Sequence, residues 1–295
     1  MEALIGVILP VFLVVAAGYG AAWRGWLEAP AVDALMKFAQ HIALPCLLFL
    51  GIARLDLAAV FDLRLLGAFY LGAFAGFALG LLGARFLFGR GWEDAVAVGF
   101  VCLFSNSLLL GLPITERAYG AGALGPNLAI IAVHAPVCYA VGITAMEIAR
   151  ASGAGVLAGL RQVARGLATN ALVIGIVLGV AVNLAGTGLP AAVWEALELI
   201  ARAGLPAALF GLGGVLFRYR PEGDLRLIAY ACAVSLVAHP AIVWGLGSWW
   251  GLGQGPFRSA VITAAVAPGV NAYLFATMYG RAKRVAASTV LIGTA

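Results

Sequence analysis

The sequence predicts an all-α integral membrane protein with ten transmembrane helices, arranged as two inverted repeats of five helices. Three observations predict this class: a composition with 63% hydrophobic and only 11% charged residues, ten apolar segments, and a similarity between the two halves of the chain. A soluble domain is about 45–50% apolar and about 25% charged. This chain has too few polar residues to cover a soluble globule, which excludes an ordinary cytosolic enzyme and a disordered protein.

The ten segments follow one another along the chain with short connections, and a membrane span needs about 20 apolar residues. They run approximately over residues 3–22, 31–53, 63–88, 93–118, 123–149, 167–186, 190–216, 225–250, 257–280 and 285–295. Only the connection 150–166 is long and polar, so we expect a first repeat over 1–149, a cytoplasmic connection over 150–166 and a second repeat over 167–295. The tenth segment is about half a span, so we expect helix ten to be truncated and the natural chain to continue.

Short strings recur in the same order in both halves, at a nearly constant separation. Ala43–Phe49 reads ALPCLLF and Gly204–Phe210 reads GLPAALF, while Asp62–Leu66 reads DLRLL and Asp224–Ile228 reads DLRLI. A Tyr-Gly pair also closes the fourth segment of each half. Because each half has an odd number of spans, the second half enters the membrane in the opposite orientation. Inverted repeats of this kind are typical of secondary transporters.

Positive charge predicts the orientation of the chain in the membrane. Lys and Arg are concentrated in alternate connections, notably around Arg150–Arg165 and Arg281–Arg284. Cytoplasmic loops carry an excess of these residues, so the N-terminus is expected outside. The net charge of +5 is scattered and forms no basic stripe, which argues against a nucleic-acid partner. The four cysteines form no CxxC pair and the three histidines lie far apart, so we expect no metal site and no cofactor.

Proline, glycine and asparagine occur inside the fourth and ninth segments. The fourth reads SNSLLLGLPI over 105–114, and the ninth reads AAVAPGVNAY over 264–273. A proline inside a helix removes one backbone hydrogen bond, and unpaired backbone groups are unfavourable in lipid unless protein or water satisfies them. We therefore expect both helices to be broken and to face the protein interior or an aqueous cavity, where half-helix N-termini stabilise an anion.

With these residues the chain resembles the auxin efflux carrier family of the bile acid, arsenite and riboflavin transporter superfamily. The resemblance covers essentially the whole chain and rests most specifically on Asn106–Pro113 and Pro268–Asn271. It implies a fold like that of the bile acid symporters, in which helices 1, 2, 6 and 7 form a scaffold and helices 3–5 and 8–10 form a transport domain. The broken helices four and nine would cross beside the substrate, and transport would occur by elevator-type alternating access.

The resemblance implies a secondary active transporter of small organic anions, such as malonate, malate or an auxin-like acid, in the bacterial inner membrane. A sodium-coupled symporter of the bile acid type is the alternative, but neither broken stretch carries a carboxylate to hold sodium, which favours a proton as coupling ion. An intramembrane lipid-modifying enzyme would need clustered acids or a nucleophile with its base, so we expect no catalytic residue. A channel, the transport direction and a homodimer are left open.

The candidate substrate-binding residues all lie in the two broken stretches. They are Ser105, Asn106, Ser107, Gly111, Pro113, Pro268, Gly269, Asn271 and Tyr273. Asparagine in a span is unfavourable without a partner, although a packing hydrogen bond to a neighbouring helix is the alternative for each. His134 and His239 lie in mid-span and are candidate proton sites, with a neutral ring bonded to a carbonyl as the alternative.

Overall fold

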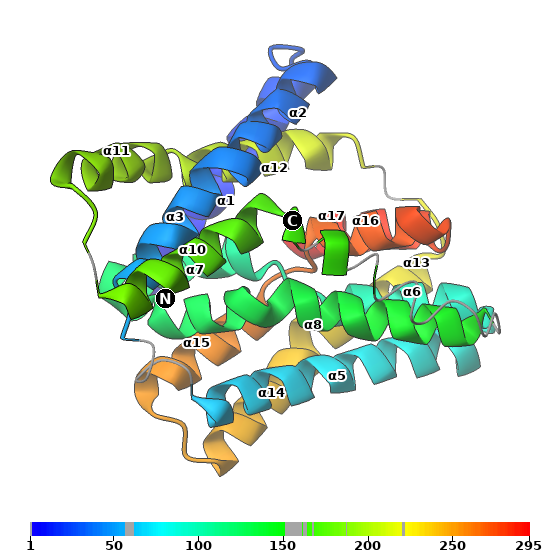
Figure 1. The fold of residues 1–295 in the computed structure, drawn as a ribbon. Helices are drawn as coiled ribbons and strands as arrows, with labels where there is room; N and C mark the ends of the chain where they lie inside the picture. The colour runs from blue at the N-terminus through cyan, green and yellow to red at the C-terminus, as the bar shows by residue number, and fades with distance from the viewer. Residues whose placement is uncertain are drawn as a thin grey trace. The chain divides into compact units, whose positions relative to one another are not determined.

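The computed structural model describes residues 2–56, 62–150, 161, 164–166, 168–186, 188–219 and 222–295 (Figure 1). All regular structure in these residues is helical, apart from one isolated antiparallel bridge between Ser105 and Pro268. Most of the predicted connection 150–166 lies outside the described residues.

The chain packs into two compact units, and each combines stretches from both halves of the sequence. Unit 1 comprises Met1–Val60, Leu112–Leu128 and Gly166–Arg218. Unit 2 comprises Phe61–Gly111, Ala129–Arg165 and Tyr219–Ala295. The assignment of helices 1, 2, 6 and 7 to a scaffold and of helices 3–5 and 8–10 to a transport domain stays a prediction.

Unit 1 is held together by close helix pairs. Its helices are α1 (Glu2–Trp23), α2 (Ala29–Phe38), α3 (Leu44–Ala53), α7 (Leu112–Tyr119), the short 3₁₀ turn Ala121–Ala123, α10 (Ala171–Ala185), α11 (Ala191–Arg202) and α12 (Gly204–Phe217). Helix α1 packs against α12, and α3 packs against α10 (Figure 1). A Cβ atom on Gly18 would overlap the carbonyl oxygen of Phe210, and one on Gly213 would overlap that of Val15. Small residues therefore bring the backbones of α1 and α12 together, as is common in membrane helices.

The C-terminal end of α3 is capped by a side chain from α10. The amide nitrogen Nδ2 of Asn183 donates hydrogen bonds to the carbonyl oxygens of Ile52, Ala53 and Leu55, at 3.0, 3.1 and 2.6 Å. Ile52 and Ala53 end α3 and Leu55 follows it, where carbonyl oxygens lack the regular partners of a helix interior. The carbonyl of Ile52 also accepts from the N–H of Leu55 at 3.2 Å. Asn183, near the end of α10, thus supplies donors to the end of α3.

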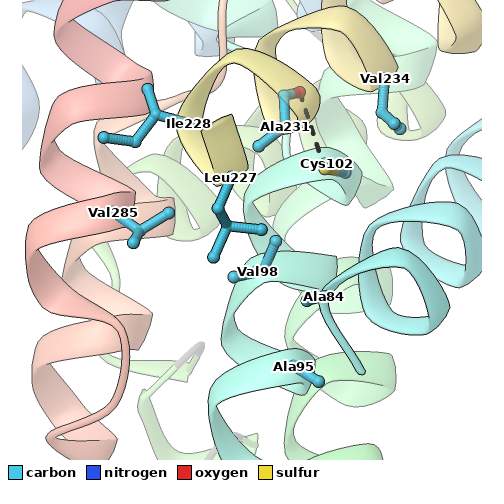
Figure 2. Close-up of a cluster of buried hydrophobic side chains, with 9 residues drawn as sticks. All are labelled: Ala84, Ala95, Val98, Cys102, Leu227, Ile228, Ala231, Val234 and Val285. Carbon is cyan, nitrogen blue, oxygen red and sulfur yellow. Dashed lines mark hydrogen bonds between the residues drawn. The ribbon is translucent and has the colours of Figure 1, made fainter. Parts of the chain in front are cut away.

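Unit 2 contains α5 (Leu63–Phe86), α6 (Trp92–Leu103), α13 (Leu225–Ala233), α14 (His239–Trp249), α15 (Gln254–Ala265), α16 (Val270–Tyr279) and α17 (Lys283–Thr294). Helix α8 (Gly125–Ala149) begins in unit 1 and continues in unit 2. Figure 2 shows a buried apolar cluster that joins α5, α6, α13 and α17, in which the thiol of Cys102 donates to the carbonyl of Ala231 at 3.8 Å. The cluster consists of Ala84, Ala95, Val98, Cys102, Leu227, Ile228, Ala231, Val234 and Val285.

Among the described residues, six helical stretches are long and apolar enough to cross a membrane. They are Gly6–Trp23, Ala29–Ala53, Leu63–Phe86, Gly125–Ala149, Ala191–Phe217 and Leu225–Trp249. The sixth and tenth predicted segments correspond to the shorter helices α10 and α17. The fourth is divided between α6 and α7, and the ninth between α15 and α16. The all-α membrane class is confirmed, and the ten-helix inverted repeat stays a prediction.

The strings that recur in the two halves form the same local structures. The side chain of Asp62 accepts a hydrogen bond from the backbone N–H of Arg64, and that of Asp224 accepts one from Arg226, so both cap a helix N-terminus. Gly120 and Gly280, which follow the two tyrosines, both have positive φ, at 83° and 71°. These two pairs of strings therefore mark helix boundaries, whereas Ala43–Phe49 lies inside the helical stretch Ala29–Ala53.

Within the described ranges, three helices have a π-helical turn that ends two residues before a proline. The pairs are Ala39–Ala43 with Pro45, Ser107–Gly111 with Pro113, and Val234–Ala238 with Pro240. The wider turn accommodates the missing proline N–H and the bulk of its ring. The sequence predicted a break around Pro113, but the chain stays helical there, because the π-helical turn Ser107–Gly111 continues directly into α7. The non-helical stretch begins earlier in the chain, at Phe104.

Candidate functional site

The fourth and ninth predicted segments each leave the helical conformation inside unit 2. Helix α6 ends at Leu103, and the chain is extended over Phe104–Asn106 before the π-helical turn begins. Helix α15 ends at Ala265, and α16 begins at Val270 after the stretch Val266–Gly269. We call these two non-helical stretches together the crossing.

The two stretches of the crossing pair with each other through their backbones. The N–H of Asn106 donates to the carbonyl of Ala267 at 2.9 Å, and the N–H of Gly269 donates to the carbonyl of Phe104 at 2.8 Å. Each break therefore supplies partners for polar backbone groups that the other exposes. This is the condition under which irregular backbone is tolerated within a membrane.

Pro268 and Gly269 suit their places in this pairing. Pro268 lies opposite Ser105, and the two bonds of the bridge are made by the neighbours of this pair. The position needs no N–H, which proline lacks. A Cβ atom on Gly269 would lie 3.0 Å from the ring of Phe104, so a larger residue would crowd this ring.

Two helix N-termini begin at the crossing. The carbonyl of Asn106 accepts hydrogen bonds from the N–H groups of Leu110 and Gly111, at 3.0 and 3.1 Å, and so opens the π-helical turn. Gly269 has extended backbone angles and precedes the first turn of α16, which contains Asn271. Helix N-termini carry partial positive charge and free N–H groups, which favour an anion.

Two neighbouring side chains at the crossing each have one buried polar atom without a hydrogen-bond partner in the described part of the chain. Ser105, Asn106 and Ser107 are 5%, 5% and 4% exposed. Within the described residues, the hydroxyl of Ser105 and the amide nitrogen Nδ2 of Asn106 have no hydrogen-bond partner. Leaving such a group unpaired costs about 1–3 kcal/mol. Two neighbouring groups of this kind indicate a place where a polar ligand is accommodated.

Asn271 is linked to a residue that the sequence did not single out. The hydroxyl of Tyr139 in α8 donates to the side-chain oxygen of Asn271 at 3.3 Å. The ring of Tyr139 packs against those of Phe100 and Phe104, with centroids 5.4 and 6.0 Å apart. An aromatic residue in an apolar run gives no indication in the sequence that it contacts a polar site. Only its hydroxyl, which needs a partner when buried, distinguishes it from phenylalanine.

The two candidate proton sites are both buried in unit 2. His134 is 2% exposed, its ring donates a hydrogen bond to the backbone of Ser105, and it lies 4.6 Å from the ring of Phe104. The ring of His239 donates to the backbone of Phe69, and the ring of Phe69 lies 5.6 Å from each histidine. His134 therefore contacts the crossing directly, whereas His239 is separated from His134 by one aromatic ring.

The remaining predicted residues have different surroundings. A Cβ atom on Gly111 would lie 3.7 Å from Thr263 of α15, so Gly111 packs close to that helix in unit 2. Pro113 belongs to unit 1, and the ring of Tyr273 packs against that of Tyr219 at 4.8 Å. In the part of the chain that the structure describes, no group of three or more His, Cys, Asp or Glu side chains could hold a metal ion.

Comparisons with known proteins agree with a transport role. The family model described as "Membrane transport protein" matches residues 3–295. The chain is also 26% identical over 301 residues to a protein of Rhizobium meliloti (strain 1021) named "Putative malonate transporter". This alignment covers 100% of the chain and 92% of the relative.

Proposed function

Because the chain belongs to the membrane transport protein family, the auxin efflux carrier family that its sequence resembles, we propose that it is a secondary active transporter of small organic anions. Family membership makes it a multi-pass membrane transporter and not an enzyme. The finer proposal rests on one observation at the crossing. Its two stretches pair through their backbones, and two side chains beside this pairing, Ser105 and Asn106, have buried donors without partners.

The chemistry of the crossing suits a carboxylate. Two helix N-termini, the hydroxyl of Ser105 and the amide of Asn106 all supply donors, and a carboxylate accepts several hydrogen bonds at once. Neither 104–107 nor 266–271 contains an acidic residue that would repel an anion. The name of the relative in Rhizobium meliloti supports malonate as the first substrate to test.

We propose elevator-type alternating access for the transport cycle, with the crossing carried by helices 3–5 and 8–10 and with helices 1, 2, 6 and 7 as scaffold. Discontinuous helices with their binding site at mid-membrane are typical of such carriers. The proposed location is the bacterial inner membrane with the N-terminus outside.

Uptake into proteoliposomes tests the proposal. We expect saturable uptake of radiolabelled malonate or malate by the purified chain, and a loss of about tenfold or more in Asn106→Ala. Asn170→Ser, which replaces an exposed amide at the N-cap of α10 in unit 1 by another capping side chain, is the matched control and should transport normally. Absence of saturable, Asn106-dependent flux for every carboxylate tested would contradict the proposal.

The coupling ion needs a separate experiment, because a proton and sodium are the two alternatives. His134 is the candidate carrier of a proton because it lies against the crossing, while its bond to the backbone of Ser105 also suits the alternative, a neutral ring. We expect uptake driven by a pH gradient, unchanged when choline replaces sodium, and no longer driven by that gradient in His134→Gln. Uptake that stops without sodium would favour the symporter of the bile acid type instead.

A further inference from the structure

In unit 2, the ends of α6 and α16 that lie away from the crossing contact each other through charged and polar groups. Glu93 and Asp94 lie in the first turn of α6, and Arg281 comes shortly after the end of α16. The Nε of Arg281 donates to Oε2 of Glu93 at 2.7 Å, so the two side chains form an ion pair. The N–H of Ala282 donates to Oδ1 of Asp94 at 3.0 Å. Two consecutive residues of α6 therefore hold the chain that follows α16.

The bond to Asp94 accompanies a backbone conformation that is unfavourable for alanine. Among the described residues, only Ala282 has a positive φ without being a glycine, and its φ is 45°. Residues with a Cβ atom rarely adopt this conformation. It persists only where the surrounding structure fixes it. The connection between α16 and α17 is therefore held in one conformation against the start of α6.

A third helix contributes an arginine to the same carboxylate. Arg150 follows the end of α8, and its Nε lies 3.5 Å from Oε2 of Glu93. Its Nη2 donates to the carbonyl of Tyr279 at 3.4 Å, and its guanidinium lies over the ring of Tyr279 at 4.6 Å. Glu93 is thus the common partner of arginines at the ends of α8 and α16. We call Glu93, Arg150 and Arg281 together the ionic cluster.

The three helices that meet at the ionic cluster also supply the polar side chains at the crossing. Ser105 and Asn106 follow the C-terminal end of α6, His134 and Tyr139 belong to α8, and Asn271 lies in the first turn of α16. Helices of 12 and 10 residues, such as α6 and α16, are about 15–18 Å long. The ionic cluster and the crossing are therefore opposite ends of the same pair of short helices.

Between these two ends, α6, α8 and α16 are closely packed. The rings of Phe100 and Phe275 are fully buried and stack with centroids 3.9 Å apart and planes inclined by 9°. A Cβ atom on Gly142 of α8 would overlap the ring of Phe100 and lie 2.9 Å from that of Phe275. Closely packed interiors transmit a displacement because they have little space to absorb it. A shift of α16 at the ionic cluster therefore reaches its other end at the crossing.

We propose that Glu93 is a positioning residue for the crossing. Its carboxylate holds Arg281 and Arg150, and it thereby fixes where α16 and α8 place Asn271 and Tyr139. This inference rests on the proposed function, because it adds to that site a residue that acts through helix position and not through contact with the anion. Only an ionised carboxylate accepts charge-assisted hydrogen bonds from both arginines, so a neutral amide of the same shape does not replace it.

Hydrogen–deuterium exchange of the full chain in detergent tests the proposal without requiring transport. We expect the backbone amides of 104–107 and 266–271 to exchange about threefold to tenfold faster in Glu93→Gln than in the wild type. The amides of α1 and α12 in unit 1 should exchange as before. Glu222→Gln is the matched control, because the ion pair of Glu222 with Arg284 at 3.5 Å involves none of α6, α8 and α16. It should leave exchange at the crossing unchanged.

Malonate uptake into proteoliposomes provides the second measurement. We expect KM to rise about threefold to tenfold in Glu93→Gln and the maximal rate to change by less than about twofold, because the site is misplaced and not removed. The double variant Glu93→Gln/Arg281→Gln should resemble Glu93→Gln alone, since both substitutions break the same ion pair.

Several outcomes would overturn the proposal. Exchange at the crossing that is unchanged in Glu93→Gln contradicts it, and so does an equal acceleration in unit 1 or in Glu222→Gln, which would indicate a general loss of stability. Additive effects of Glu93→Gln and Arg281→Gln would also contradict it. If Glu93→Gln fails to fold, exchange in Arg281→Gln decides. If the wild type transports no carboxylate, the proposed function fails, while exchange still decides whether Glu93 positions the crossing.

Discussion

At the scale of single residues, the crossing depends on side chains whose neighbours lie far away in the sequence. Asn106 and Ser105 were identifiable from the sequence because polar residues are rare in this chain and lie beside proline and glycine. Tyr139 was not, since its role comes from a contact with Asn271, which is distant along the chain. A sequence pattern indicates that a polar group needs a partner, but it does not identify the partner.

Removing the hydroxyl of Tyr139 tests its contribution to the crossing. In Tyr139→Phe the side-chain oxygen of Asn271 loses its donor, which costs about 1 kcal/mol and leaves the amide less well oriented. We expect KM for malonate uptake to rise about fivefold while the melting temperature changes little. Tyr19→Phe in unit 1 is the control, because this exposed tyrosine packs edge-on against Phe217. An unchanged KM in Tyr139→Phe would contradict the prediction.

Asn183 provides a prediction about stability alone. Asn183→Leu removes the donor shared by three carbonyl oxygens at the end of α3. We expect a loss of about 1–3 kcal/mol in the free energy of unfolding, measured by denaturant titration in detergent. Asn170→Ser retains a capping side chain at the start of α10 and should unfold like the wild type. Equal stability of Asn183→Leu and the wild type would show that water replaces the lost bonds.

At the scale of the elements, the contact between α1 and α12 predicts a sharp difference between two glycines of one helix. A Cβ atom on Gly18 would overlap the backbone of Phe210, whereas one on Gly20 meets nothing within 4 Å. Gly18→Ala forces the helices apart and should cost about 1–3 kcal/mol or more. Gly20→Ala should leave the stability unchanged or slightly raised. Thermal melting of the two variants in detergent measures this difference, and equal melting temperatures would contradict it.

The N-cap of α13 predicts a dependence of stability on pH. Asp224 is partly desolvated, which raises the pKa of its carboxyl. Hydrogen bonds from the backbone N–H groups of Leu227 and Arg226 and from Arg90, together with the charge of Arg90, outweigh this and bring the pKa below its ordinary value of 3.8. A carboxyl with a lowered pKa stabilises the fold above its unfolded-state pKa, and this stabilisation is lost as the pH falls through its folded-state pKa.

Comparison of the wild type with Asp224→Asn measures this effect, because asparagine also caps helices but carries no charge. We expect the wild type to melt at a higher temperature at about pH 6, the difference to shrink as the pH falls below 3.8, and to vanish once the pH is below the still lower folded-state pKa. Arg90→Gln should reduce the difference, since it removes the ion pair of 2.8 Å with Asp224. A difference that is the same at both pH values would rule out the charge as its cause.

At the scale of the whole molecule, the sequence predicted the class of the fold better than the places where helices stop. Hydropathy and the recurring strings indicated helices with defined ends, because caps such as Asp62 and Asp224 act locally. The sequence predicted the interruption around Pro113, but in the structure the helix is interrupted at Phe104, earlier in the chain. A proline indicates only that a helix is perturbed nearby. The place of the interruption depends on the pairing of Phe104 and Asn106 with a distant stretch.

The proposed orientation makes a prediction about the molecule in its membrane. An epitope placed before Met1 should be accessible to antibody on intact spheroplasts if the N-terminus is outside. An epitope inserted in the connection 150–166 should become accessible only after permeabilisation. The opposite pattern would reverse the proposed topology.

The bonds between Asn106, Ala267, Gly269 and Phe104 join residues that emerge from the ribosome at very different times. Until Ala267 has been translated, the stretch Phe104–Asn106 has no second stretch to pair with. Its polar backbone groups then enter the bilayer without hydrogen-bond partners. A nascent chain of this protein must therefore shelter that stretch, with water, a translocon or an insertase, until the second half arrives.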